Sequence, residues 1–159
     1  MKKKIIILCG VANSGKTTTL RELVKTKTEH TGTIKMGART ICVKGFSSPQ
    51  EREDFCKVKK VKENIQKRLD YCKRKFKNAF VLVMPFTIQK RKGRINKDCI
   101  VKPIKWLKSR GYSVHIIYLR KVTDADLMMK KITSEEIGSR ENSSSKQARE
   151  LKDFIKKHL

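Results

Sequence analysis

The sequence has few acidic residues and no long apolar run. The first shortage leaves a large positive charge, and the second argues against a membrane-spanning protein. Lys and Arg number 40 against 15 Asp and Glu, so the formal net charge is +25 over 159 residues. No apolar run approaches the length of a membrane-spanning helix, and we expect no membrane segment. The apolar residues 5–8 follow a basic start, as in a signal peptide, but this run is too short to be one.

Histidine is also scarce, and the cysteines are widely spaced. Three histidines and five cysteines without a C-x-x-C pair predict no zinc site. We expect the thiols to be reduced and partly buried, as in a cytoplasmic protein. The cysteines are Cys9, Cys42, Cys56, Cys72 and Cys99.

The charge of +25 predicts strong attraction to polyanions. One explanation is a nucleic-acid substrate or partner. The other is a lysine-biased proteome, or counter-charge for an anionic nucleotide acceptor. The basic residues are spread over most segments, which favours the second explanation, and the sequence leaves both open.

A glycine-rich motif near the amino end is the most informative feature that is present. Residues 10–17, Gly-Val-Ala-Asn-Ser-Gly-Lys-Thr, fit G-x-x-x-x-G-K-[ST] at every fixed position. Residues 4–9 are typical of a buried strand and residues 17–27 of a helix. These flanks argue against a chance glycine turn. The candidate nucleotide-binding residues are Gly10, Val11, Ala12, Asn13, Ser14, Gly15, Lys16, Thr17 and Thr18.

The chemistry of phosphate binding requires these residue types. Glycines let backbone N–H groups converge on phosphate oxygens, and the helix N-terminus adds positive potential there. The Lys16 amine is placed to reach the β- and γ-phosphates, and the Thr17 hydroxyl to ligate a metal. The sequence therefore predicts ATP and Mg²⁺ as ligands.

The motif and its flanks resemble the P-loop NTPase superfamily, and more specifically the small P-loop kinases of nucleosides, nucleotides and polynucleotide 5′-hydroxyls. The first 25 residues carry the specific part of the resemblance, and the remainder is similar only in the order of its elements. The resemblance implies a three-layer α/β fold with a mostly parallel sheet of about four to five strands. It also implies one domain over residues 1–159, with a candidate mobile lid at 133–145.

The order of elements along the chain points to the same architecture. Alternating strands and helices predict a parallel sheet whose strands end at one edge, where ligands bind. Pieces 33–36 and 40–44 form either a hairpin or one sheet strand. Proline 103 either kinks its helix or marks the first turn. The remaining expected elements are a helix opened by a capping box at 48–51, a strand at 79–84 ended by Pro85, a basic loop at 87–97, a helix ending at 110, a strand at 112–119, and helices at 124–132 and 146–158.

Four residues are candidates for catalysis: Lys16, Glu51, Arg94 and Arg120. Glu51 follows the second strand, where small kinases place an acid, but it also fits a capping box as a ligand of backbone N–H groups. Arg94 lies in the basic loop and Arg120 after a strand, so each either contacts an anionic ligand or is solvated. The strand at 80–85 carries no acid, a departure from the superfamily that argues against rapid autonomous ATP hydrolysis.

Two functions from different classes fit these residues. The first is an ATP-dependent kinase acting on a nucleotide, nucleoside or nucleic-acid hydroxyl. The second is a weakly hydrolytic or non-catalytic ATP-binding module that binds nucleic acid or a partner protein. GTP is disfavoured, because the stretch 96–98 lacks one residue of the guanine-reading N-K-x-D pattern.

Overall fold

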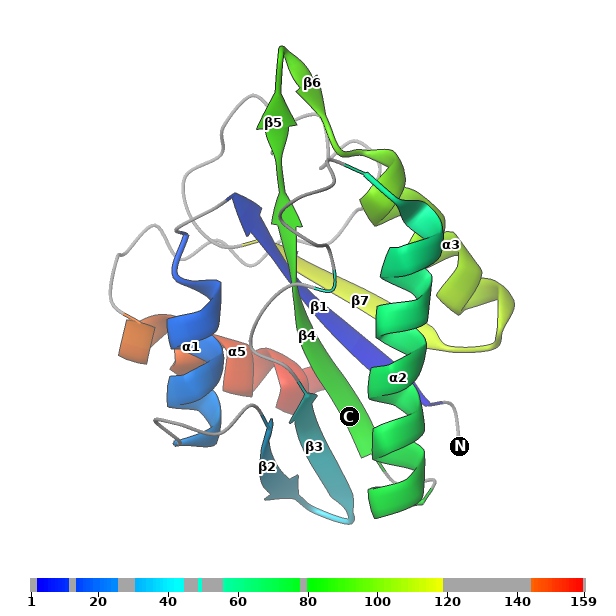
Figure 1. Ribbon diagram of the computed structural model, residues 1–159. Coiled ribbons are helices and arrows are strands. Elements are labelled where there is room, and N and C mark those ends of the chain that lie inside the picture. Colours follow the sequence, from blue (N-terminus) through cyan, green and yellow to red (C-terminus); the bar gives the residue numbers. More distant parts are fainter. Residues whose placement is uncertain are drawn as a thin grey trace.

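The computed structural model describes residues 3–11, 14–25, 31–44, 49, 56–77, 80–118 and 144–158. Their elements follow the alternating order expected of an α/β protein (Figure 1). In chain order they are β1 (Lys4–Val11), α1 (Lys16–Val24), β2 (Thr31–Met36), β3 (Arg39–Lys44), α2 (Val58–Phe76), β4 (Phe80–Ile88), β5 (Lys90–Arg91), β6 (Arg94–Ile95), α3 (Asp98–Ser109), β7 (Ser113–Tyr118) and α5 (Ser144–His158).

A five-stranded sheet in the order β2-β3-β4-β1-β7 forms the centre of the molecule. The pairs β3–β4, β4–β1 and β1–β7 are parallel, and only β2 runs antiparallel to its neighbour β3. The predicted three-layer α/β fold with a mostly parallel sheet is therefore confirmed. The two pieces at 33–44 form a hairpin, and both of its strands belong to the sheet.

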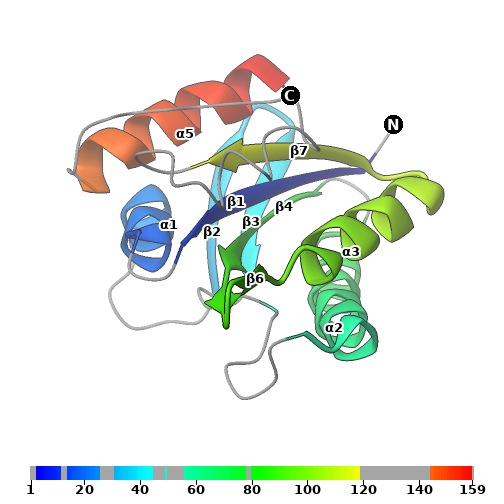
Figure 2. The ribbon, with the colours of Figure 1, turned by 90° about the horizontal axis from the view of Figure 1, so that it is seen from above.

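The alternation of side chains along β1 separates two apolar cores. Ile5 and Ile7 pack with apolar side chains of α2 and α3, whereas Ile6 and Leu8 pack with those of α1 and α5. All four are at most 1% exposed, because helices cover both faces of this central strand. Figure 2 shows the resulting layers, with α1 and α5 on one side of the sheet and α2 and α3 on the other.

The long helix α2 begins later than the sequence predicts. Cys56 and Lys57 precede it in non-helical backbone, so the capping box at 48–51 does not open this helix. A disulfide between Cys56 and Cys99 holds this approach to the helix against the first turn of α3. The amphipathic pattern beyond Val58 is confirmed, because Val61 and Ile65 are buried in the core.

The third parallel strand is longer than expected, because Pro85 does not end it. β4 continues to Ile88, and Pro85 pairs with Leu8 of β1. Pairing with β3 stops at Val83, so beyond that point no described strand pairs with this edge of β4. Proline is tolerated at such an edge, where the missing N–H breaks no ladder hydrogen bond.

Two other boundaries differ from expectation. Pro103 lies inside α3, in its second turn, and is buried there, so it does not mark the start of the helix. Ser144 already belongs to α5, so the end of the proposed 133–145 lid is helical. The rest of that lid and the helix expected at 124–132 lie outside the described residues. No helix in the described part is long and apolar enough to cross a membrane.

Candidate phosphate-binding site

The glycine-rich motif lies where three parallel strands end. Val11, at the end of β1, is in register with Ile88 of β4, and Cys9 is in register with Tyr118 of β7. The chain then turns and enters α1 at Lys16 (Figure 1). This is the edge at which open α/β sheets bind ligands.

The Lys16 amine is held over the loop by three oxygen atoms. It donates to the carbonyl oxygens of Gly10 at 3.0 Å and Val11 at 2.6 Å, and to Ser14 Oγ at 3.2 Å. The side chain is buried, although a lysine is seldom buried without partners. Because an ammonium has three donors, a phosphate oxygen that reaches this amine must replace one of these acceptors.

The start of α1 is suited to an anion. Gly15 has a φ of +84°, a left-handed conformation that favours glycine, and it contributes no capping side chain. The first turn of α1 carries no acidic residue. Such a helix N-terminus presents backbone N–H groups and positive potential to a phosphate. The described part of the loop therefore fits a nucleotide phosphate.

The described residues offer few ligands for a metal ion. Thr17, the predicted metal ligand, lies in the first turn of α1. None of the described strands contains Asp or Glu, as the sequence of residues 80–85 already indicated for β4. Among the described residues, no group of three or more His, Cys, Asp or Glu is placed to hold a metal. The described strands therefore offer no carboxylate that could share a metal ion with Thr17.

Four predicted site residues lie outside the described residues: Ala12, Asn13, Glu51 and Arg120. Of the four catalytic candidates, Lys16 and Arg94 are described. Arg94 is exposed and begins β6, opposite Arg91 of β5. The structure thus places Lys16 in the phosphate loop and Arg94 in a separate hairpin that follows β4.

The segment expected to be a basic loop is instead a structured hairpin. Lys92 and Gly93, with φ of +49° and +75°, form the two-residue turn between β5 and β6. Asn96 closes its base: its Nδ2 donates to the Thr87 carbonyl at 3.0 Å, and its Oδ1 accepts from the Gln89 N–H at 2.8 Å. Because Asn96 is 1% exposed, these bonds are shielded from water and fix the hairpin to the end of β4.

Sequence reasoning missed a buried hydrogen bond that joins α1, which follows the phosphate loop, to α5. The Thr19 hydroxyl in α1 donates to Gln147 Oε1 in α5 at 2.9 Å, and both side chains are buried. A Cβ built on Gly15 would lie 3.7 Å from the same Gln147 oxygen. The only sequence signal was the position of Gln147 beside Ala148, on the predicted inner face of α5.

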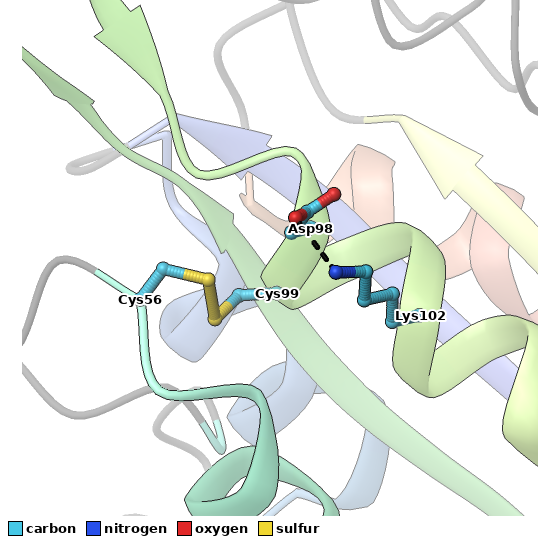
Figure 3. Close-up of polar contacts among 4 residues, drawn as sticks. All are labelled: Cys56, Asp98, Cys99 and Lys102. Atoms are coloured by element: carbon cyan, nitrogen blue, oxygen red, sulfur yellow. Dashed lines mark ion pairs between the residues drawn. A yellow bond between two sulfur atoms is a disulfide. The ribbon is translucent and has the colours of Figure 1, made fainter.

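The cysteines correct the expectation of five reduced thiols. Cys56 and Cys99 form a disulfide at the start of α3, beside the Asp98–Lys102 ion pair (Figure 3). The other three cysteines, Cys9, Cys42 and Cys72, form no disulfide and are buried. Two of them touch: Cys72 Sγ lies 2.9 Å from Cys42 Sγ. This hydrogen bond lowers the pKa of the Cys42 thiol and, together with burial, raises the pKa of the Cys72 thiol.

Phe86 and Trp106, aromatic side chains of the kind that can stack on nucleotide bases, have structural roles instead. Phe86 in β4 is fully buried in the core and presents no face to a ligand. Trp106 in α3 packs against the same core, and the Arg110 guanidinium lies 5.1 Å from its ring centroid. Phe46 lies outside the described residues.

Comparison with known proteins supports the fold and leaves the activity open. No protein-family model and no curated protein matches the sequence. A sugar kinase from Janibacter sp. HTCC2649, solved without ligand, superposes with a TM-score of 0.50 at 11% identity, over 96% of this chain and 94% of that chain.

Two further solved structures are similar at lower scores. The FeoB G-domain from Methanococcus jannaschii gives a TM-score of 0.43 at 18% identity, over 98% of this chain and 96% of that chain. A probable GTP-binding protein engB gives 0.39 at 13% identity, over 98% and 99% of the two chains. With the glycine-rich loop at the carboxyl edge of a mostly parallel sheet, the chain has the fold of the P-loop NTPases.

Proposed function

We propose that this chain is an ATP-binding, P-loop kinase-like phosphotransferase. Its acceptor would be the hydroxyl group of a nucleotide, a nucleoside or a nucleic-acid end. The observation that carries the proposal is the Lys16 amine, held over the phosphate loop by Gly10, Val11 and Ser14. An ammonium in this position offers the positive charge that a transferring phosphoryl group requires.

Each residue of the proposed site has a distinct task. The loop and the N-terminus of α1 bind the phosphates, Lys16 contacts the β- and γ-phosphates, and Thr17 holds Mg²⁺. When bound at Thr17, Mg²⁺ would supply positive charge that neutralises part of the charge on the phosphates. Glu51 would accept the acceptor hydroxyl proton, and Arg94 and Arg120 would bind anionic groups of the acceptor or of the transferred phosphoryl.

The proposal extends to the organisation of the chain. Residues 1–159 would form one domain, with a candidate lid at 133–145 whose end, from Ser144, is already helical. The nucleotide donor favours a location in the cytoplasm. The Cys56–Cys99 disulfide argues in the opposite direction, because such bonds are rare in that compartment.

A second candidate is a weakly hydrolytic or non-catalytic ATP-binding module that contacts nucleic acid or a partner protein. No described strand contains Asp or Glu. This favours the second candidate, because an acid at a strand end normally supports the metal in the superfamily that the chain resembles. The two candidates differ in the fate of the γ-phosphate. A kinase moves it to an acceptor, and the module binds ATP but releases phosphate slowly or not at all.

The deciding experiment follows γ-labelled ATP in the presence of Mg²⁺ and a panel of acceptors. The panel contains nucleosides, nucleoside monophosphates and oligonucleotides with a 5′-hydroxyl. Labelled product with one acceptor class supports the kinase. ATP binding with label found only in inorganic phosphate, or not released, supports the module. If no nucleoside triphosphate binds at saturating concentration, both candidates fail.

A further inference from the structure

The β5–β6 hairpin carries an unusual concentration of positive charge. Five of its eight residues between positions 90 and 97 are basic and none is acidic, and all five basic side chains are exposed. Asp98, the next residue, forms an ion pair with Lys102 at 2.9 Å. Within the described ranges, none of the five pairs with a carboxylate. These basic residues are Lys90, Arg91, Lys92, Arg94 and Lys97.

Two of these charges face each other across the hairpin. Arg91 and Arg94 are register partners, so their Cβ atoms lie about 5 Å apart on one face of the ribbon. Like charges directly opposite each other destabilise a strand pair. A phosphate held between the two guanidinium groups would remove this repulsion through charge-assisted hydrogen bonds.

The hairpin projects beside the phosphate loop. Val11, at the start of the loop, is in register with Ile88, and β5 begins only two residues after Ile88. At about 3.3 Å per residue, the first hairpin cation lies roughly 7 Å along the chain from the strand end beside the loop. Figure 1 shows β5 and β6 extending beyond the end of β4, away from the helices that cover the sheet.

The hairpin is rigid enough to serve as a binding arm. The buried Asn96 side chain ties its base to Thr87 and Gln89 through two hydrogen bonds. The Cys99 N–H donates to the Asn96 carbonyl at 3.0 Å, and the disulfide joins Cys99 to Cys56 (Figure 3). A fixed arm loses little conformational entropy when it binds a ligand.

From these observations we infer that the β5–β6 hairpin binds the phosphodiester backbone of a single nucleic-acid strand and leads its end to the phosphate loop. Five cations along one hairpin match several phosphates in series better than the one or two of a mononucleotide. The inference rests on the proposed function for the role of the strand as acceptor. The binding of the strand itself does not depend on phosphoryl transfer.

Salt dependence of binding tests the inference. The variant Arg91→Gln with Arg94→Gln is compared with Lys152→Gln combined with Lys156→Gln, which removes two exposed cations from α5 on the other side of the sheet. The probe is a fluorescent 12-nucleotide single strand, titrated without ATP between 50 and 200 mM salt. Each lost phosphate contact should reduce the slope of log K against log salt by about 0.7.

The hairpin variant should therefore have a slope smaller by about 1.4, and the α5 variant an unchanged slope. The unmodified protein should lose about sevenfold more affinity across this salt range than the hairpin variant. Equal slopes for the two variants would overturn the inference, because binding would then follow net charge alone. Equal affinity for the strand and for polyglutamate would overturn it as well.

Two further measurements distinguish failure of this inference from failure of the proposed function. Circular dichroism checks that the hairpin variant is folded, and Lys90→Gln with Lys92→Gln replaces it if it is not. Transfer from ATP to a free nucleoside is measured on the same proteins. Strand binding that depends on the hairpin, with no transfer to any acceptor, would refute the proposed function and leave this inference intact. Transfer without strand binding would refute the inference alone.

Discussion

At the scale of single residues, the proposed function makes Lys16 a principal contact between the loop and a nucleotide. Its amine donates to the carbonyls of Gly10 and Val11. Hydrogen bonds to charged groups contribute roughly 1.5–3 kcal/mol each. Lys16→Ala should therefore weaken ATP binding by roughly ten- to a hundredfold, measured by calorimetry.

Lys35 provides a matched control for that substitution. It is an exposed lysine of β2, in the hairpin that forms the far edge of the sheet. Lys35→Ala removes the same charge and should leave ATP affinity unchanged. Equal affinities for the unmodified protein and Lys16→Ala would contradict the assignment of residues 10–17 as the phosphate loop.

The buried pair Thr19 and Gln147 supports the loop from behind. Thr19→Val or Gln147→Leu alone leaves one buried polar group without its partner, which should lower the free energy of unfolding by about 1–3 kcal/mol. The double variant removes both groups, so its loss should be smaller than the sum of the single losses. Denaturant unfolding of all four proteins measures this coupling. Strictly additive losses would mean that the hydrogen bond contributes nothing.

At the scale of elements, the contact between α1 and β2 depends on a glycine. A Cβ placed on Gly32 would lie 2.3 Å from Val24 Cγ2, a distance that real side chains do not reach. Gly32→Ala should therefore lower the free energy of unfolding by about 1–3 kcal/mol, because the helix or the strand must shift. Denaturant unfolding measures the loss.

A second substitution tests that explanation. Val24→Ala removes Cγ1 and Cγ2 but keeps Cβ, which a Cβ on Gly32 would also meet too closely, so in the Gly32→Ala background it should restore only part of the lost stability. If Val24→Ala lowers stability by the same amount with and without Gly32→Ala, the steric explanation is wrong.

Sequence reasoning recovered those elements that local patterns specify. The motif Gly10–Thr17 predicted the strand and the helix around it because its glycines and its lysine are defined by local geometry. The end of β4 was missed because Pro85 normally ends a strand, and its tolerance depends on where β3 stops pairing. The hairpin at 90–95 was missed because the buried Asn96 side chain closes its base by bonding to Thr87 and Gln89, a contact that no turn pattern in the sequence marks.

The candidate site was predicted only in part for the same reason. Gln147 lies 128 residues from Thr19, and no local signal marks such a pair. The Cys56–Cys99 bond was also invisible, because sequence spacing does not show which cysteines meet in the fold. Local chemistry thus predicted the phosphate loop, and long-range packing determined what supports it.

At the scale of the whole molecule, the disulfide closes a large part of the chain into a loop. Cys56 and Cys99 are 43 positions apart, and cross-linking a loop of that length removes about 4 kcal/mol of unfolded-state entropy. A thiol reductant should therefore lower the denaturant midpoint of the unmodified protein. Guanidinium unfolding with and without reductant gives the difference.

The control for this effect is the double variant Cys56→Ser with Cys99→Ser. It should resemble the reduced protein and should not respond to reductant. The buried thiols of Cys9, Cys42 and Cys72 should react slowly with a labelling reagent in either protein until it unfolds. Identical unfolding curves for the oxidised and reduced protein would contradict the presence of the bond.

The contact between α1 and α5 has a consequence for the order in which the protein matures. Gln147 is synthesised 128 residues after Thr19, a delay on the order of ten seconds at ribosomal speed. Throughout that interval the nascent chain already contains its glycine-rich loop, but α5 is not yet available to pack against α1. A ribosome-bound chain stalled before residue 144 should therefore capture nucleotide poorly, and competence should arise only as the final helix docks.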